Sequence, residues 1–180
     1  MWQPDTQGII PIPIEEIADF KLGLNIVPVS DMKRRTGIDG CISKDLSAIY
    51  VDSWQYLNHE FRSRFTIAHE LGHFWMHGDY IKGLDLKNVD NWKAIVMKSK
   101  NTWNSMEYQA YMFAGFVLIP TLTLEQEIGE LAPGYELSSS IDELQELEFN
   151  LTREVAKKFQ VSDAVVQKRL DTFFNQKRRT

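Results

Sequence analysis

The stretch Phe65-Thr-Ile-Ala-His69-Glu70-Leu-Gly-His73 places two histidines four residues apart, with a glutamate directly after the first. Apolar residues around this stretch recur at intervals of three and four, which predicts a helix over residues 59–77: Phe61, Phe65, Ala68, Gly72 and Trp75. We expect Gly78 to end this helix, since glycine is the usual residue just beyond a helix C-terminus.

Side chains four residues apart lie one above the other on the same face of a helix. His69 and His73 can therefore bind one zinc ion through two imidazole nitrogens, each at about 2.0–2.1 Å. Glu70 is offset around the helix, where it can take a proton from a water that attacks a carbonyl. The alternative is a chance match on an amphipathic helix. With four histidines in the chain, we expect such a match in about one sequence in a hundred.

A catalytic zinc needs a third protein ligand, and Glu107 is the leading candidate. It lies 34 residues after His73, at the start of a second predicted helix over residues 105–119. The alternative is that Asn104 and Glu107 form a capping box at this helix start. Asp79 is a rival ligand by its offset of six residues from His73, but Met76 stands where that pattern needs glycine.

Four more residues are candidates for contacting the substrate or supporting the ligands, by closeness in sequence: His77, Tyr108, Arg64 and Tyr80. His77 also suits the negative end of the helix, which favours a histidine. The single cysteine, Cys41, excludes an internal disulfide, and we expect a small buried residue rather than a nucleophile.

The composition indicates a globular protein without a general affinity for nucleic acid or membranes. The chain has 180 residues, 43% of them hydrophobic, and a formal net charge of −5. The N-terminal residues do not resemble a signal peptide. The longest uncharged run, residues 108–124, falls short of the ~20 apolar residues that a membrane span needs, so we expect a cytoplasmic protein.

The remaining elements predict an α+β fold with a small sheet before the main helix. We expect a helix over residues 14–22 that ends at Gly23, and a strand over residues 24–29 closed by Pro28. Further expected elements are strands at 40–43 and 48–51, a short helix at 92–98, a linker or junction at 120–140, and helix from 141 to about 174.

Three stretches of the sequence together resemble the ImmA/IrrE metallopeptidase family of bacteria, phages and integrative elements. The first runs from Arg64 through His73 to His77 and Gly78, and the second from Glu107 to Pro120. The third is the opening helix and strand with Gly40 and residues 49–51. The resemblance implies a zincin-like fold, in which a small twisted sheet packs beside the zinc helix, and a single Zn²⁺ with Glu107 as the third ligand.

The resemblance also implies a protein partner. Members of this family typically act on helix-turn-helix repressors of the XRE type, either relieving repression under stress or in toxin–antitoxin-like gene pairs. We therefore expect an endopeptidase that cleaves such a repressor or an antitoxin-like partner. The expected metallopeptidase core covers residues 1–125, and a helical extension covers residues 126–180.

Residues 152–173 of this extension have the spacing of a helix-turn-helix, although Gln160 stands where a turn glycine is usual. Lys168 and Arg169 could contact phosphates there. A helix pair that packs within the protein or binds a partner is the other interpretation. The alternative function is thus a non-enzymatic, zinc-containing regulator that binds DNA or a repressor through these helices.

Overall fold

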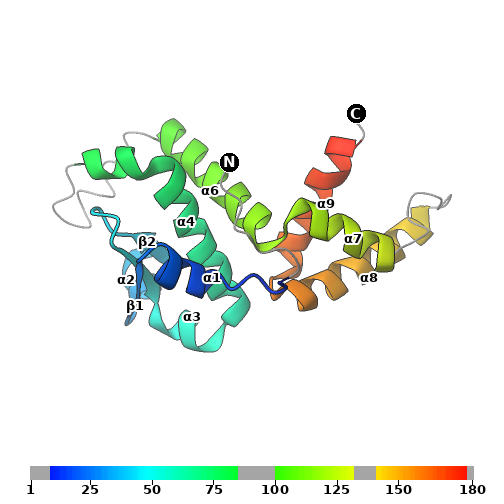
Figure 1. Ribbon diagram of the computed structural model, residues 1–180, viewed down its shortest axis with the longest axis horizontal. Helices are drawn as coiled ribbons and strands as arrows, with labels where there is room; N and C mark the ends of the chain where they lie inside the picture. The colour runs from blue at the N-terminus through cyan, green and yellow to red at the C-terminus, as the bar shows by residue number, and fades with distance from the viewer. Residues whose placement is uncertain (1–8, 85–99, 132–140, 178–180) are drawn as a thin grey trace. The chain divides into compact units, whose positions relative to one another are not determined.

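The computed structural model describes residues 9–84, 100–131 and 141–177 (Figure 1). The chain divides into two compact units. We call Pro13–Ala114 the sheet unit, and Met1–Ile12 together with Gly115–Thr180 the helical unit. Across these described residues the fold is mostly helical with one small sheet, which confirms the predicted α+β class. The short helix expected at residues 92–98 lies outside the described residues.

The sheet contains strands β1 (Asn25–Val29), β2 (Gly40–Ile42) and β3 (Ala48–Asp52), in the order β1-β3-β2. β1 runs parallel to β3, and β2 runs antiparallel to it with Cys41 opposite Tyr50. All three strands were expected from the sequence. Pro28, however, lies inside β1 opposite Val51 rather than closing the strand. An edge strand tolerates proline because its outer side needs no N–H donor.

Short helical segments surround the sheet. α1 (Ile14–Glu16) continues into a π-helical turn, η1 (Ile17–Lys21), and Gly23 follows with a φ of 67°, which confirms the helix expected over 14–22. α2 (Met32–Thr36) was not expected, and α3 (Ser53–Asn58) follows β3 directly. The Asp52 carboxylate caps α3 by accepting from the Gln55 amide at 3.0 Å, and it also accepts from the Lys33 amide at 2.9 Å.

The main helix, α4 (Glu60–Gly83), is longer than expected, so the prediction that it ends at Gly78 is wrong. Gly78 is buried within α4, where an added Cβ would lie 2.7 Å from the Leu46 side chain. The glycine therefore serves close packing instead of helix termination. Phe61 and Trp75 of the predicted apolar face are partly exposed, because a neighbouring stripe of α4 faces the core: Ser63, Ile67, Leu71 and Ile81.

Helix α6 (Lys100–Leu118) begins earlier than residue 105 and packs closely against α4. A Cβ added at Gly72 of α4 would lie 3.0 Å from the Ala110 Cα atom of α6 and 3.2 Å from its carbonyl oxygen. The two backbones can approach this closely because position 72 has no side chain. This contact sets where the side chains of α6 meet those of α4.

The helical unit contains α7 (Thr121–Leu131), α8 (Ile141–Phe159) and α9 (Asp163–Lys177), together with the end of α6. The linker expected over 120–140 is wrong for its first part. There the Pro120 carbonyl accepts from the Leu124 amide at 2.9 Å and starts α7. Residues 132–140 lie outside the described residues. α8 and α9 meet at Gln160, whose φ of 53° is the left-handed conformation that the missing turn glycine would have adopted.

Arg169 lies in the interior of the helical unit, where 2% of its surface is exposed. Its Nε donates to the Ile119 carbonyl at 3.1 Å, and its Nη2 donates to the Thr121 hydroxyl at 3.1 Å. The guanidinium also lies over the Phe116 ring, and burial lowers its pKa to about 10. The prediction that Arg169 contacts phosphates is therefore wrong, because its guanidinium already holds the end of α6 to the start of α7.

Candidate metal centre

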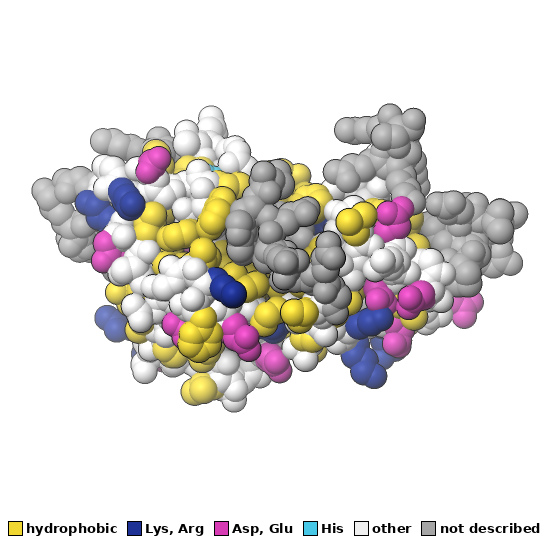
Figure 2. Space-filling model, in the orientation of Figure 1, with side chains coloured by type: hydrophobic (Ala, Val, Ile, Leu, Met, Phe, Trp, Pro, Cys, Tyr) yellow, Lys and Arg dark blue, Asp and Glu magenta, His cyan; other side chains and the backbone are white. Residues whose placement is uncertain are grey.

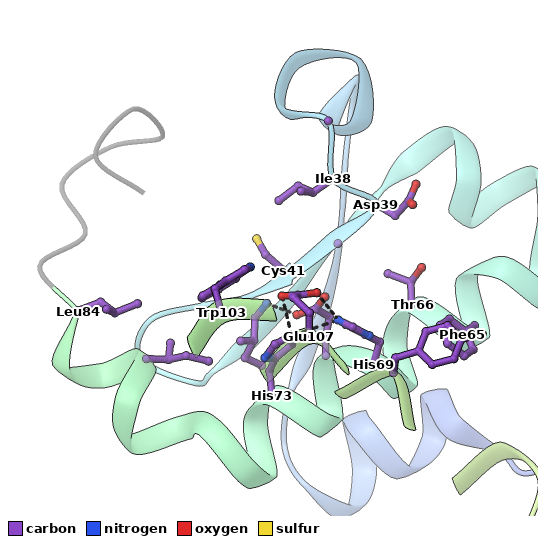
Figure 3. Close-up of a pocket in the computed structure, with 16 residues that line it drawn as sticks. Ile38, Asp39, Cys41, Phe65, Thr66, His69, His73, Leu84, Trp103 and Glu107 are labelled. Atoms are coloured by element: carbon purple, nitrogen blue, oxygen red, sulfur yellow. Dashed lines mark hydrogen bonds and ion pairs between the residues drawn. The ribbon is translucent and has the colours of Figure 1, made fainter. Parts of the chain in front are cut away.

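Three side chains from two helices converge on one point of the sheet unit. Figure 3 shows His69 and His73 on α4 pointing toward Glu107 on α6. The Nε2 atoms of the two histidines are 3.1 Å apart. His69 Nε2 lies 3.2 Å from Glu107 Oε2, and His73 Nε2 lies 3.3 Å from Glu107 Oε1. The predicted pair on α4 and the predicted distant carboxylate thus come together.

These distances fit a group that can hold a metal ion. Ligand atoms about 2.0–2.1 Å from a tetrahedral zinc lie roughly 3.3 Å from one another. The three separations of 3.1, 3.2 and 3.3 Å are close to that value. Two nitrogens and a carboxylate oxygen are also the donor set of known three-ligand catalytic zinc sites, which keep a fourth position for water or substrate.

The alternatives to Glu107 as the third member of this group do not hold. α6 begins by Lys100, which puts Glu107 about two turns inside the helix, so it cannot cap the helix start. Asp79 is exposed on α4, which continues to Gly83. Six residues along a continuous helix bring Asp79 to a different side of α4 from His73.

Electrostatics in the group favour a charged carboxylate beside the two imidazoles. Burial alone would raise the pKa of Glu107, but its contacts with the imidazoles of His69 and His73 outweigh that effect and hold the pKa at about 2. Burial likewise opposes a charge on His69, yet the hydrogen bond to Glu107 raises its pKa overall. A cation placed among these three side chains would meet the negative charge of the Glu107 carboxylate.

Glu70 lies beside the group but points to the sheet. It is 6% exposed, and burial raises its pKa despite the neighbouring imidazoles. Its Oε2 accepts a hydrogen bond of 2.9 Å from the Ile42 amide on β2. β2 lies close to α4 at Gly40, where an added Cβ would lie 2.5 Å from the Thr66 side chain. The role of the Ile42 amide could not be predicted, because a backbone group carries no signature in the sequence.

The ligand group opens into a cavity of about 470 Å³ within the sheet unit. β2 and the residues before it form one wall, and α4 and α6 form the others (Figure 3). Aromatic and aliphatic side chains surround the polar centre: Ile38, Phe65, Trp103 and Tyr111. A metal ion at the ligand group would therefore face an apolar space that can accept part of a peptide.

Cys41 also lines this cavity, and burial raises the pKa of its thiol to about 12, with Glu70 adding to the effect. A thiol with this pKa stays protonated near neutral pH and is a poor nucleophile. Cys41 is half-buried and not fully buried as expected, while its protonated thiol agrees with the expectation that it is not the nucleophile.

The four residues that were expected to contact the substrate or support the ligands do not line the cavity. Arg64 is buried with its guanidinium 3.8 Å from Glu15, while Tyr80 is 37% exposed and Tyr108 is 59% exposed. His77 is buried directly behind His73, with the two Nδ1 atoms 3.1 Å apart. Gln109, which sequence reasoning missed, contacts His77 from α6; its only signal was its place two residues after Glu107.

A comparison of the sequence with known protein families identifies a metallopeptidase family over the range that contains the ligand group. The model of a peptidase family described as the IrrE N-terminal-like domain matches residues 49–171, well over half of the chain. The match covers both histidines, Glu70 and Glu107, and it extends through α8 into α9. No curated protein matches the chain.

Proposed function

Because this chain belongs to the IrrE N-terminal-like family of M78 metallopeptidases, we propose that it is a zinc-dependent endopeptidase with a zincin-like site. The observation that carries the proposal is the convergence of His69, His73 and Glu107 within ligand distance of one ion, at the edge of a cavity. Their chemistry suits zinc because imidazole and carboxylate are its common ligands, and three of them leave a position open.

Each polar side chain has a separate role in the proposed reaction. His69, His73 and Glu107 hold the ion, and Glu70 handles the proton. Zinc, when bound, supplies Lewis-acid polarisation of the peptide carbonyl and lowers the pKa of water. Glu70 takes a proton from the attacking water and passes it to the leaving amine. The Ile42 amide holds one oxygen of Glu70, so the carboxylate keeps a fixed direction while it exchanges the proton.

The proposed substrate is a helix-turn-helix repressor of the XRE type or an antitoxin-like protein. The resemblance to the ImmA/IrrE family supports this choice, and the apolar walls of the cavity suit a peptide segment with bulky side chains. In this proposal the protein is a bacterial or phage regulator that removes a repressor under stress. Residues 1–125 are the catalytic core, and residues 126–180 are a helical extension.

The competing proposal is a regulator whose α8–α9 helix pair binds DNA, as the turn at Gln160 suggests. The distribution of charged side chains in the helical unit weakens this competing proposal. Arg169 is buried, Lys158 pairs with Glu127, and Lys157 and Glu154 line the same pocket. Figure 2 shows basic and acidic side chains close together on the visible face of this unit. A membrane-spanning helix is a separate question: each helix in the described part of the chain is too short or too polar to span a bilayer.

The decisive experiment is Glu70→Gln, with Glu60→Gln as the matched control on an exposed position of α4. The readouts are zinc content and cleavage of a helix-turn-helix repressor of the XRE type. We expect both variants to bind one zinc, and Glu70→Gln to lose about 10²–10⁴-fold in cleavage rate. Cleavage at the full rate by Glu70→Gln would refute the assigned mechanism. Tight binding to duplex DNA at moderate salt, without cleavage, would favour the competing regulator.

A further inference from the structure

A chain of hydrogen bonds leads from the ligand group to the surface of α6. His77 lies one turn after His73 on α4 and is 7% exposed. Its Nδ1 lies 3.1 Å from His73 Nδ1, and its Nε2 lies 3.0 Å from Gln109 Oε1. Both nitrogens of His77 are thus engaged, and neither the ligand set nor the proton transfer proposed above uses this residue.

The position of each proton in this chain follows from what each atom can do. The amide group of Gln109 is oriented by its Nε2, which donates to the Ser105 hydroxyl at 3.4 Å and leaves Oε1 toward His77. A carbonyl oxygen can only accept, so His77 Nε2 must donate to it. A neutral imidazole carries a single N–H, and Nδ1 of His77 is therefore an acceptor.

His73 must then supply the proton between the two rings. Its Nδ1 donates to His77 Nδ1, which leaves Nε2 of His73 with a lone pair. That lone pair faces the point where Nε2 of His69 and the carboxylate of Glu107 also meet. An unprotonated nitrogen 3.3 Å from a carboxylate oxygen is stabilised when a cation lies between them. Only this tautomer of His73 can bind a metal through Nε2.

We propose that Gln109 and His77 are positioning residues that hold His73 in its Nδ1–H tautomer, and so raise the affinity of the site for zinc. The inference rests on the proposed function, because it takes His73 as a metal ligand. Partners of this kind orient ligating histidines and commonly change metal affinity by about 10–100-fold. Here the partner is a second histidine, and its own tautomer is set by an amide on a different helix.

Four variants and one control test this proposal by competition for zinc with a chromophoric chelator. His77→Leu and Gln109→Leu remove the acceptors. His77→Asn and Gln109→Glu keep an oxygen where the neighbouring ring N–H needs one. We expect the two leucine variants to lose about 10–100-fold in zinc affinity and the other two to stay within about threefold of the wild type. His59→Leu, at an exposed histidine, should leave the affinity unchanged.

A second readout separates positioning from a general loss of structure. In the zinc-loaded protein, ¹⁵N chemical shifts should show His77 with its proton on Nε2, and Gln109→Leu should convert it to a mixture of tautomers. Gln109 is exposed, so this variant should keep the wild-type melting temperature in the metal-free state. Wild-type zinc affinity in Gln109→Leu, or a proton on Nδ1 of His77, would overturn the proposal.

The outcomes also distinguish this inference from the proposed function. A wild-type protein that binds no zinc would refute the proposed function and, with it, the assigned role of His73. A protein that binds zinc as expected and shows the expected losses, but cleaves no protein, would leave the positioning role standing. Wild-type zinc binding and cleavage in both leucine variants would remove the positioning role alone.

Discussion

Replacing Gly72 by alanine tests whether the close contact between α4 and α6 builds the metal centre. The new Cβ would lie 3.0 Å from the Ala110 Cα atom, 3.2 Å from its carbonyl oxygen and 3.2 Å from the Phe113 ring. Two of these three atoms are backbone, so α6 must move by a few tenths of an ångström. Glu107 lies one turn before Ala110 on the same helix and would move with it.

The expected stability change is the sum of two opposing effects. Overpacking of this kind costs about 1–3 kcal/mol, whereas alanine gains about 0.5–1 kcal/mol over glycine inside a helix. We expect Gly72→Ala to lower the free energy of unfolding by about 1 kcal/mol, and the displaced carboxylate to weaken zinc binding about tenfold. Urea denaturation of the metal-free protein and chelator competition measure the two quantities separately.

Gly129→Ala is the matched control, because this glycine lies inside α7 with nothing within 4 Å of an added Cβ. It should stabilise the protein by about 0.5–1 kcal/mol and leave zinc binding unchanged. If Gly72→Ala matched Gly129→Ala in stability and bound zinc like the wild type, the packing argument would be refuted.

Three further predictions concern the side chains of Arg169, Asp52 and Cys41. Arg169→Ala should lower the free energy of unfolding by about 3 kcal/mol, while its exposed neighbour Lys168→Ala should change it by less than about 0.5 kcal/mol; urea denaturation compares them. Two backbone amides lower the pKa of Asp52, so its stabilising effect is complete above its unfolded pKa of about 3.9 and is lost as the pH falls below it. Asp52→Asn should therefore flatten the decline of the melting temperature in acid, and a decline as steep as in the wild type would contradict this cause. In the metal-free protein, Cys41 should react with iodoacetamide far more slowly at pH 8 than after unfolding in urea, because burial raises its pKa to about 12; equal rates would contradict it.

The histidine pair of the candidate site could be predicted from the sequence, because its common face depends on one helix. The spacing of His69 and His73 fixes their common face as soon as residues 59–77 form a helix, whatever surrounds it. Composition and short apolar runs likewise sufficed for the α+β class and for the three strands of the sheet. Glu107 could be named as a ligand, but from the residues alone it remained balanced against a helix cap.

Tertiary packing determined how segments that are far apart in the sequence contact one another. It excluded the cap by starting α6 at Lys100, and it carried α4 past Gly78, since a glycine that fits against Leu46 need not end a helix. It also placed Arg169 in the interior, although the same residue in sequence looked like a phosphate contact.

The hydrogen bonds of Glu70 and His77 beside the candidate metal centre also could not be predicted from the sequence. Ile42 reaches Glu70 through a backbone amide, and Gln109 reaches His77 from another helix. No periodicity in the sequence encodes either contact, because each depends on how close β2 and α6 come to α4. The sequence was therefore sufficient to propose which side chains bind a metal ion and which one exchanges a proton. The packing of β2, α4 and α6 determined which of these side chains contact one another. Distances between segments depend on tertiary packing and not on local backbone geometry.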